Sequence, residues 1–231
     1  MIWLYSGFYA RGVDENVLQS DVQVSVTENE QGIMFSPSAL KAPIGMLFFH
    51  GGGVEPIAYA PLIRGVAEEG YFSVIVKLPY RFAPFEGHRN EAINRAIKIM
   101  AQNPDVHTWV VAGHSKGGKI AAELVRDNRS SVDALVLLGT THPRDFSLAS
   151  LEIPVKKIQA SLDGIATVEK SVATKGNLPQ HTQWIEIEGG NHSQFGYYGH
   201  QFLDGSATIG RTEQQRRTLE EILATIEGLQ R

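Results

Sequence analysis

The sequence contains no cysteine. Disulfide bonds, thiolate metal sites and a cysteine nucleophile are therefore excluded. Long hydrophobic runs are missing too: no stretch reaches the roughly 18 apolar residues of a membrane-spanning helix, so we expect no membrane span. The apolar residues 1–12 lack a basic segment and a cleavage site of small residues, so they do not resemble a signal peptide. The expected location is cytoplasmic, although a protein trimmed of an export segment would have the same sequence.

A basic excess is also missing. The 21 lysines and arginines are outnumbered by 25 acidic residues, which gives a net charge of -4. Nucleic-acid-binding proteins usually gather basic residues on one face, so we expect no nucleic-acid partner. The hydrophobic content of 42% and the charged content of 20% are those of an ordinary globular protein. The length suits one α/β domain, and we predict a single domain over 1–231.

Short apolar runs alternate with helical patterns through the centre of the chain. Continuous apolar strands separated by helices are typical of a doubly wound, mostly parallel sheet with helices on both faces. The sequence therefore predicts the α/β class. The predicted parallel strands are 44–49, 72–76, 108–112, 134–138, 155–160 and 183–187, and the predicted helices between them are 57–69, 89–101 and 117–127.

The two ends of the chain carry different patterns. Alternating apolar residues at 22–26 and 33–35 predict an N-terminal antiparallel hairpin. A C-terminal helix is predicted to begin near Thr212, with Thr212 and Gln215 forming a capping box. Between them, residues 193–210 are rich in glycine and aromatic residues, and we predict an ordered loop there.

The most informative segment is Gly113-His-Ser-Lys-Gly, which lies between a predicted strand and a predicted helix. This is the setting of a nucleophile elbow, in which a serine stands on a strained turn and glycines on either side prevent collisions. We predict Ser115 as the nucleophile. The backbone N–H of Lys116, at the start of the helix, is the first predicted oxyanion donor. The alternative is a tight strand-to-helix turn without chemistry; the strand and helix around the motif favour catalysis.

A second glycine-rich segment, His50-Gly-Gly-Gly, follows the predicted strand 44–49. Open α/β sheets bind ligands at the carboxyl ends of their strands, and a glycine loop there lets a backbone N–H approach a substrate carbonyl. We predict a second oxyanion donor at Gly52 or Gly53, and we expect His50 to shape the loop. A plain flexible turn is the alternative.

A serine nucleophile needs a base, and the base needs a group that fixes its tautomer. His192 follows the last predicted strand on a glycine-permitted turn, and we predict it as the general base. Asp163 lies at the carboxyl end of strand 155–160 and is the predicted acid, with Asp145 as the alternative. The resulting order along the chain is serine, then acid, then histidine, with each residue placed after a predicted parallel strand.

These segments together resemble the α/β-hydrolase superfamily, and in particular a small bacterial branch of carboxylesterase-like and dienelactone-hydrolase-like proteins. The resemblance extends from about Ile44 to the C-terminal helix. It is carried by Phe49-His-Gly-Gly-Gly, Gly113-His-Ser-Lys-Gly-Gly, Leu162-Asp-Gly-Ile-Ala-Thr and Glu188-Gly-Gly-Asn-His-Ser-Gln-Phe-Gly-Tyr-Tyr-Gly. It implies the α/β-hydrolase fold, triad roles for Ser115, Asp163 and His192, and hydrolysis of a small-molecule carboxylic ester without cofactor or metal. Residues 140–154 leave room only for a short cap.

Other functions remain open on the same residues. A thioesterase, lactonase, amidase or acyltransferase would keep the triad, and a non-catalytic binding protein would keep the fold. The side chain of Lys116 could attract an anionic substrate, or its stem could pack while its ammonium reaches solvent; we favour packing. Six aromatic residues near the predicted site could line an apolar pocket or belong to the core; we favour the core for each and do not predict them as site residues: Tyr80, Phe82, Phe85, Phe195, Tyr197 and Tyr198.

Overall fold

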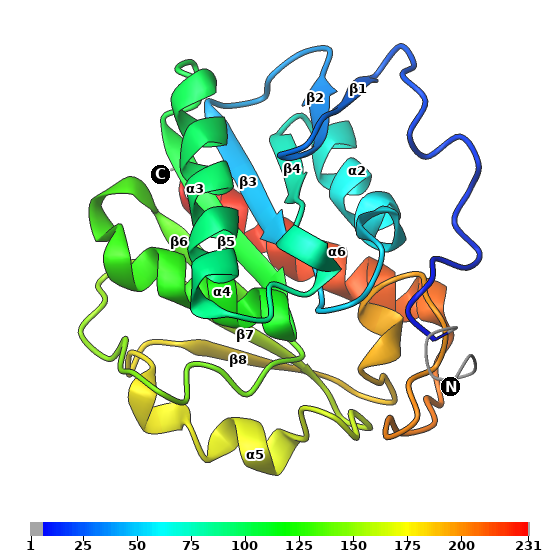
Figure 1. Ribbon diagram of the computed structural model, residues 1–231, viewed down its shortest axis with the longest axis vertical. Helices are drawn as coiled ribbons and strands as arrows, with labels where there is room; N and C mark the ends of the chain where they lie inside the picture. Colours follow the sequence, from blue (N-terminus) through cyan, green and yellow to red (C-terminus); the bar gives the residue numbers. More distant parts are fainter. Residues whose placement is uncertain (1–6, 231) are drawn as a thin grey trace.

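The computed structural model describes residues 7–230. Residues 1–6, which belong to the segment predicted not to be a signal peptide, lie outside this range, as does residue 231. Within the described residues, the strands form one 8-stranded sheet in the order β1-β2-β4-β3-β5-β6-β7-β8 (Figure 1). Their bounds are Val24–Glu28, Gly32–Pro37, Ile44–Phe49, Phe72–Val76, Thr108–His114, Ala134–Leu138, Val155–Ala160 and Gln183–Ile187, for β1 to β8 in turn.

The sheet is antiparallel at one edge and parallel elsewhere. β1 pairs with β2, and β2 with β4, in antiparallel register, whereas all pairs from β4 through β3, β5, β6 and β7 to β8 are parallel. The predicted hairpin and the predicted α/β class are both confirmed. Because parallel strands run in the same direction, the carboxyl ends of β3, β5, β7 and β8 all meet at one edge of the sheet.

The helices follow the strands as predicted, with small changes at their ends. The α-helices are α2 (Ala60–Glu68), α3 (Glu86–Gln102), α4 (Lys116–Asp127), α5 (Val168–Val172) and α6 (Arg211–Gly228). Short 3-10 turns are η1 (Pro56–Tyr59), η2 (Pro79–Arg81), η3 (Arg129–Ser131), η4 (Lys175–Asn177) and η5 (Ser193–Phe195). The predicted helix 57–69 is thus η1 followed by α2, and the sequence did not predict α5.

The predicted capping box on α6 is wrong. Gly210 is the N-cap residue of this helix and no side chain caps it. Gln215 instead donates to the carbonyl of Gln194 in the preceding loop. Its neighbour Gln214 both accepts from the amide of Asn191 and donates to the Asn191 carbonyl. The start of α6 therefore binds the segment after β8 at Asn191 and, within the loop 193–210, at Gln194; this loop is ordered as predicted.

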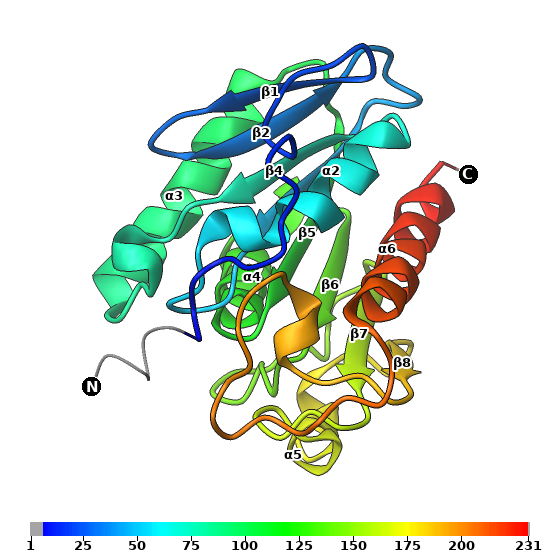
Figure 2. The ribbon, with the colours of Figure 1, turned by 90° about the vertical axis from the view of Figure 1, so that its right-hand side faces the viewer.

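Helices cover both faces of the sheet (Figure 2): α3 and α4 lie on one face, α2 and α6 on the other. Every residue of β3, β4 and β6 is buried, which explains the continuous apolar runs in the sequence. Residues 140–154 contain no helix, consistent with the predicted short cap. Among the described residues, no helix is both long and apolar enough to cross a membrane.

Candidate active site

Ser115 stands on a strained turn between β5 and α4. Its φ of 53° and ψ of -116° lie in a region that side-chain-bearing residues rarely adopt. The glycines around it allow this conformation. A β-carbon on Gly117 would overlap with the carbonyl of Phe49 at the end of β3, and one on Gly113 would overlap with Gly117 itself. The geometry of the predicted elbow is therefore present, and it lifts Ser115 above the carboxyl edge of the sheet.

Asp163 and His192 are joined by a buried hydrogen bond. Nδ1 of His192 lies 2.8 Å from Oδ2 of Asp163, and only 1% of the His192 surface and 4% of the Asp163 surface are exposed. The other carboxylate oxygen accepts the backbone amides of Ile165 at 2.8 Å and Ala166 at 2.6 Å. An ionised carboxylate only accepts hydrogen bonds, so Nδ1 carries the proton and Nε2 is free to act as a base.

The alternative acid, Asp145, is placed elsewhere. It is exposed, and its carboxylate forms an ion pair with Lys119 at 2.8 Å. The structure therefore pairs His192 with Asp163 and not with Asp145.

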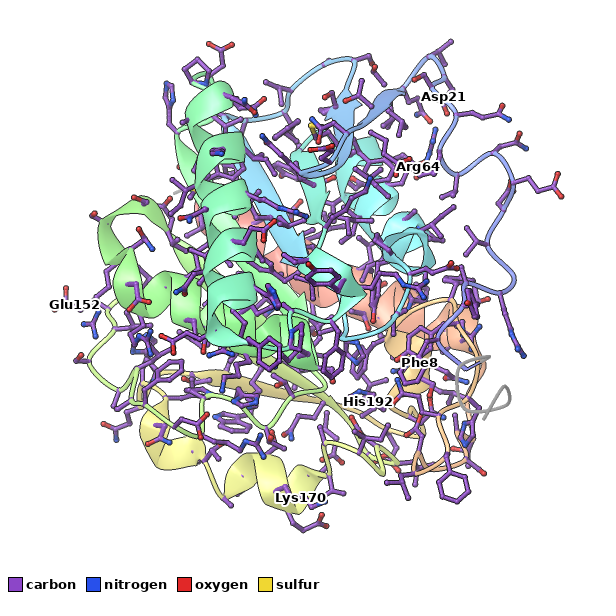
Figure 3. The ribbon with its side chains drawn as sticks, viewed as in Figure 1. Phe8, Asp21, Arg64, Glu152, Lys170 and His192 are labelled. Carbon is purple, nitrogen blue, oxygen red and sulfur yellow. The ribbon has the colours of Figure 1, made fainter. Side chains whose placement is uncertain are left out.

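His192 lies beside the elbow. The centroid of the His192 ring is 4.4 Å from that of His114, the residue before Ser115. His192 is labelled in Figure 3. In the described part of the chain, no hydrogen bond joins the Ser115 hydroxyl to His192. Catalytic hydrogen bonds are often long or poorly aligned without substrate and tighten in the complex. The structure thus places the predicted base against the residue that precedes the predicted nucleophile, and among residues 7–230 it shows no hydrogen bond between base and nucleophile.

A network behind the elbow was not predicted from the sequence. The Tyr59 hydroxyl lies 2.8 Å from Nδ1 of His114 and accepts the amide of Gly51 at 3.2 Å. Burial, and then the neighbouring His192, hold the pKa of His114 well below its usual range. His114 is therefore neutral, and Tyr59 links the elbow to the glycine loop. Tyr59 gave no signal in the sequence because it lies within a helical pattern.

The glycine loop separates the two predicted oxyanion donors. The amide of Gly53 donates to the Arg81 carbonyl at 2.7 Å, so it is already engaged. The amide of Gly52 has no acceptor among residues 7–230. A β-carbon on Gly52 would lie 3.1 Å from Cβ of Lys116, so these two backbones are close. Lys116 begins α4, where an amide has no partner within the helix. This geometry favours Gly52 and Lys116 over Gly53.

His50 shapes this loop, as expected. Its Nδ1–H donates to the carbonyl of Gly51 at 2.9 Å, and Nε2 accepts the amide of Leu78 at 3.1 Å. Burial lowers the pKa of His50 to about 4. A neutral imidazole therefore connects the glycine loop to the segment after β4.

The segment after β4 carries three exposed aromatic side chains. Tyr80, Phe82 and Phe85 are 81%, 49% and 71% exposed, so their interpretation as core residues is wrong, whereas Phe195 and Tyr198 are buried as expected. The Phe82 ring lies against Gly52. The ammonium of Lys116 is 5.6 Å from the centre of the same ring, consistent with a packed lysine stem.

A separate cleft of about 430 Å³ lies between the N-terminal segment and α2. Arg64 lines it, and its guanidinium is paired with Asp21 and Glu68. Figure 3 shows Arg64 and Asp21 well away from His192. We therefore assign no part of the candidate site to this cleft.

The strand order and the serine elbow together define a hydrolase of the α/β class. Residues 45–216 match the alpha/beta hydrolase family, and the chain belongs to that family. The resemblance to the α/β-hydrolase superfamily and the predicted α/β-hydrolase fold are thus confirmed.

Solved structures share this fold at low sequence identity. A bacterial heroin esterase is 16% identical with a TM-score of 0.68, covering 93% of this chain and 88% of that chain. An esterase from Pyrobaculum calidifontis is 17% identical with a TM-score of 0.68, again covering 93% and 88%. A serine hydrolase homologue from Coxiella burnetii is 15% identical with a TM-score of 0.63, covering 88% and 98%. No curated protein matches the chain.

Proposed function

We propose that this protein is a serine hydrolase that cleaves carboxylic esters with small or medium acyl groups. Ser115 is the nucleophile, His192 the general base and Asp163 the residue that orients the base. The observation that carries the proposal is the buried hydrogen bond between Asp163 and His192, whose ring contacts His114 in the strained turn that carries Ser115. An imidazole fixed in this tautomer is suited to activating a serine hydroxyl, which is otherwise a poor nucleophile.

The reaction proceeds through an acyl-enzyme. Nε2 of His192 takes the proton of Ser115 as the hydroxyl oxygen attacks the ester carbonyl. The backbone N–H groups of Gly52 and Lys116 bind the oxyanion that forms. His192 then gives its proton to the departing alcohol as the ester bond breaks. Water attacks the acyl-enzyme in the same way, with His192 again as base, and releases the acid and free Ser115.

Esters are favoured over other acyl compounds for two reasons. First, two proteins that share the fold are described as esterases. Second, an ester releases an alcohol, which is a better leaving group than the amine of an amide. The short connection 140–154 and the Phe82 ring beside Gly52 suit a compact acyl group over a long chain.

The first test is covalent labelling with a fluorescent fluorophosphonate. The wild-type protein should label, and Ser115→Ala and His192→Ala should not. Ser130→Ala, which changes an exposed serine in η3, is the matched control and should label like the wild type. A folded wild-type protein that does not label would support a binding protein instead. A series of p-nitrophenyl esters, with thioester, lactone and anilide analogues beside it, then ranks the substrates; preference for an analogue would overturn the ester assignment.

A further inference from the structure

Asp204, within the loop 193–210, binds the backbone of two separate turns. Oδ1 of Asp204 accepts the amide of His192 at 3.1 Å and that of Gly164 at 3.3 Å, and Oδ2 accepts the amide of Ser193 at 2.7 Å. Gly164 directly follows Asp163. One carboxylate therefore holds the backbone on both sides of the Asp163–His192 hydrogen bond, although the reaction described above makes no use of it.

Close backbone packing supports this arrangement. A β-carbon on Gly164 would lie 2.9 Å from the amide nitrogen of Gly205, and one on Gly205 would overlap with the carbonyl of Leu162. Glycine at both positions lets the two segments touch. The side chain of Asn191 donates to the Gly205 carbonyl at 2.7 Å, which ties the same segment to the residue before His192. The segment ending at Gly205 thus lies between the turn that carries the acid and the turn that carries the base.

We propose that Asp204 is a positioning residue that sets how the Asp163–His192 pair faces Ser115. This inference rests on the proposed function for its effect on rate. Both carboxylate oxygens accept hydrogen bonds, and bonds to an ionised acceptor are stronger than neutral ones. A reacting group displaced by about 1 Å can lose about a hundredfold in rate. Weakening the hydrogen bonds from Asp204 to the two turns therefore slows attack by Ser115 without removing any reacting atom.

The test variant is Asp204→Asn, which is nearly isosteric. Asparagine can present its oxygen to the amides bound by Oδ1, but its NH₂ group then faces the amide of Ser193, next to His192. Asp204→Glu is a second variant, which keeps the charge but moves the carboxylate. The matched control is Asp133→Asn, because Asp133 also accepts a backbone amide, that of Trp109 at 2.7 Å, at the opposite edge of the sheet.

Active-site titration with a fluorophosphonate separates an effect on positioning from an effect on folding. The amplitude of labelling gives the number of reactive serines, and the rate constant gives the reactivity of each one. Asp204→Asn and Asp204→Glu should keep the full amplitude and react about tenfold to a hundredfold more slowly. Their kcat for ester hydrolysis should fall with little change in KM. Asp133→Asn should react at the wild-type rate. A wild-type rate constant per reactive site in the Asp204 variants, whatever their amplitude, would overturn the proposal.

A second measurement keeps this proposal separate from the proposed function. The proton on Nδ1 of His192, hydrogen-bonded to Asp163, should give a downfield resonance in the proton NMR spectrum whether or not the protein is a hydrolase. The resonance should move or disappear in Asp204→Asn and remain in Asp133→Asn. If the wild type fails to label but this change is seen, the proposed function fails and the positioning role stands; an unchanged resonance in Asp204→Asn contradicts the positioning role.

Discussion

Acid should destabilise this protein through His50, the imidazole that supports the glycine loop. In the folded chain His50 is fully buried, donates to the carbonyl of Gly51 and accepts the amide of Leu78. Protonation would place a charge in the core and remove the acceptor for Leu78. Burial accordingly lowers the pKa of His50 from 6.5 to about 4.

The sign and size of the effect follow from that difference. Between pH 6.5 and about 4 the unfolded chain holds a proton on this residue that the folded chain does not. Stability is therefore lost as the pH falls through this window, with no further loss from His50 below it. Each pH unit is worth about 1.4 kcal/mol, so His50 alone should remove about 3 kcal/mol of unfolding free energy.

The assay is urea unfolding of the wild type and His50→Gln across this pH range. Glutamine offers one donor and one acceptor but does not titrate. Because His114 and His142 also have lowered pKa values and act in the same direction, the informative quantity is the difference between the two proteins. The wild type should lose about 3 kcal/mol more than His50→Gln on going from neutral pH to about pH 4. Parallel curves would refute the reasoning.

Two further perturbations probe the packing. Gly117→Ala should destabilise the fold by about 1–3 kcal/mol or more in chemical unfolding, because its β-carbon overlaps with the Phe49 carbonyl, whereas Gly87→Ala, in open space on α3, should be neutral or slightly stabilising; equal effects would contradict the close approach. Lys157→Met should raise the unfolding free energy at pH 7 by about 1–3 kcal/mol, because burying the charged ammonium destabilises the wild type. Burial lowers the pKa of Lys157 from 10.5 to about 7, so the wild type recovers this stability as the pH rises toward 10.5. The gain should therefore shrink at about pH 10, and a constant gain in thermal unfolding at both pH values would count against a buried charge.

Much of the fold could be predicted because the buried strands leave a simple record. The observed bounds equal the predicted ones for five strands: β3, β4, β6, β7 and β8. β3, β4 and β6 are buried along their whole length and appear in the sequence as short, mainly apolar runs, which a local pattern can reveal. β7 and β8 include lysine, glutamine and glutamate, so this reason does not apply to them. The pairing of Asp163 with His192 followed from chain order together with strand ends, which the parallel sheet brings to one edge.

Other parts of the site depend on contacts that no local pattern records. The amide of Gly53 is engaged by the Arg81 carbonyl, which comes from a different loop, and this contact is what favours Gly52 as the oxyanion donor. Thr212 and Gln215 have the spacing of a capping box, yet α6 begins at Arg211, before Thr212. Gln214 and Gln215 instead form hydrogen bonds with the segment after β8. Capping preference is worth about 1 kcal/mol, which a few tertiary hydrogen bonds can outweigh.

Backbone strain gives an independent reason to look for function at the carboxyl edge of the sheet. Among the described residues, the non-glycine positions with positive φ are Tyr80, Arg81, Ala83 and Ser115. Ser115 follows β5, and the others follow β4, so all four lie at the same edge. Each such conformation costs about 1–3 kcal/mol. Strained backbone of this kind tends to cluster at functional sites, so its concentration near the glycine loop and the serine favours this edge as the place to test for function.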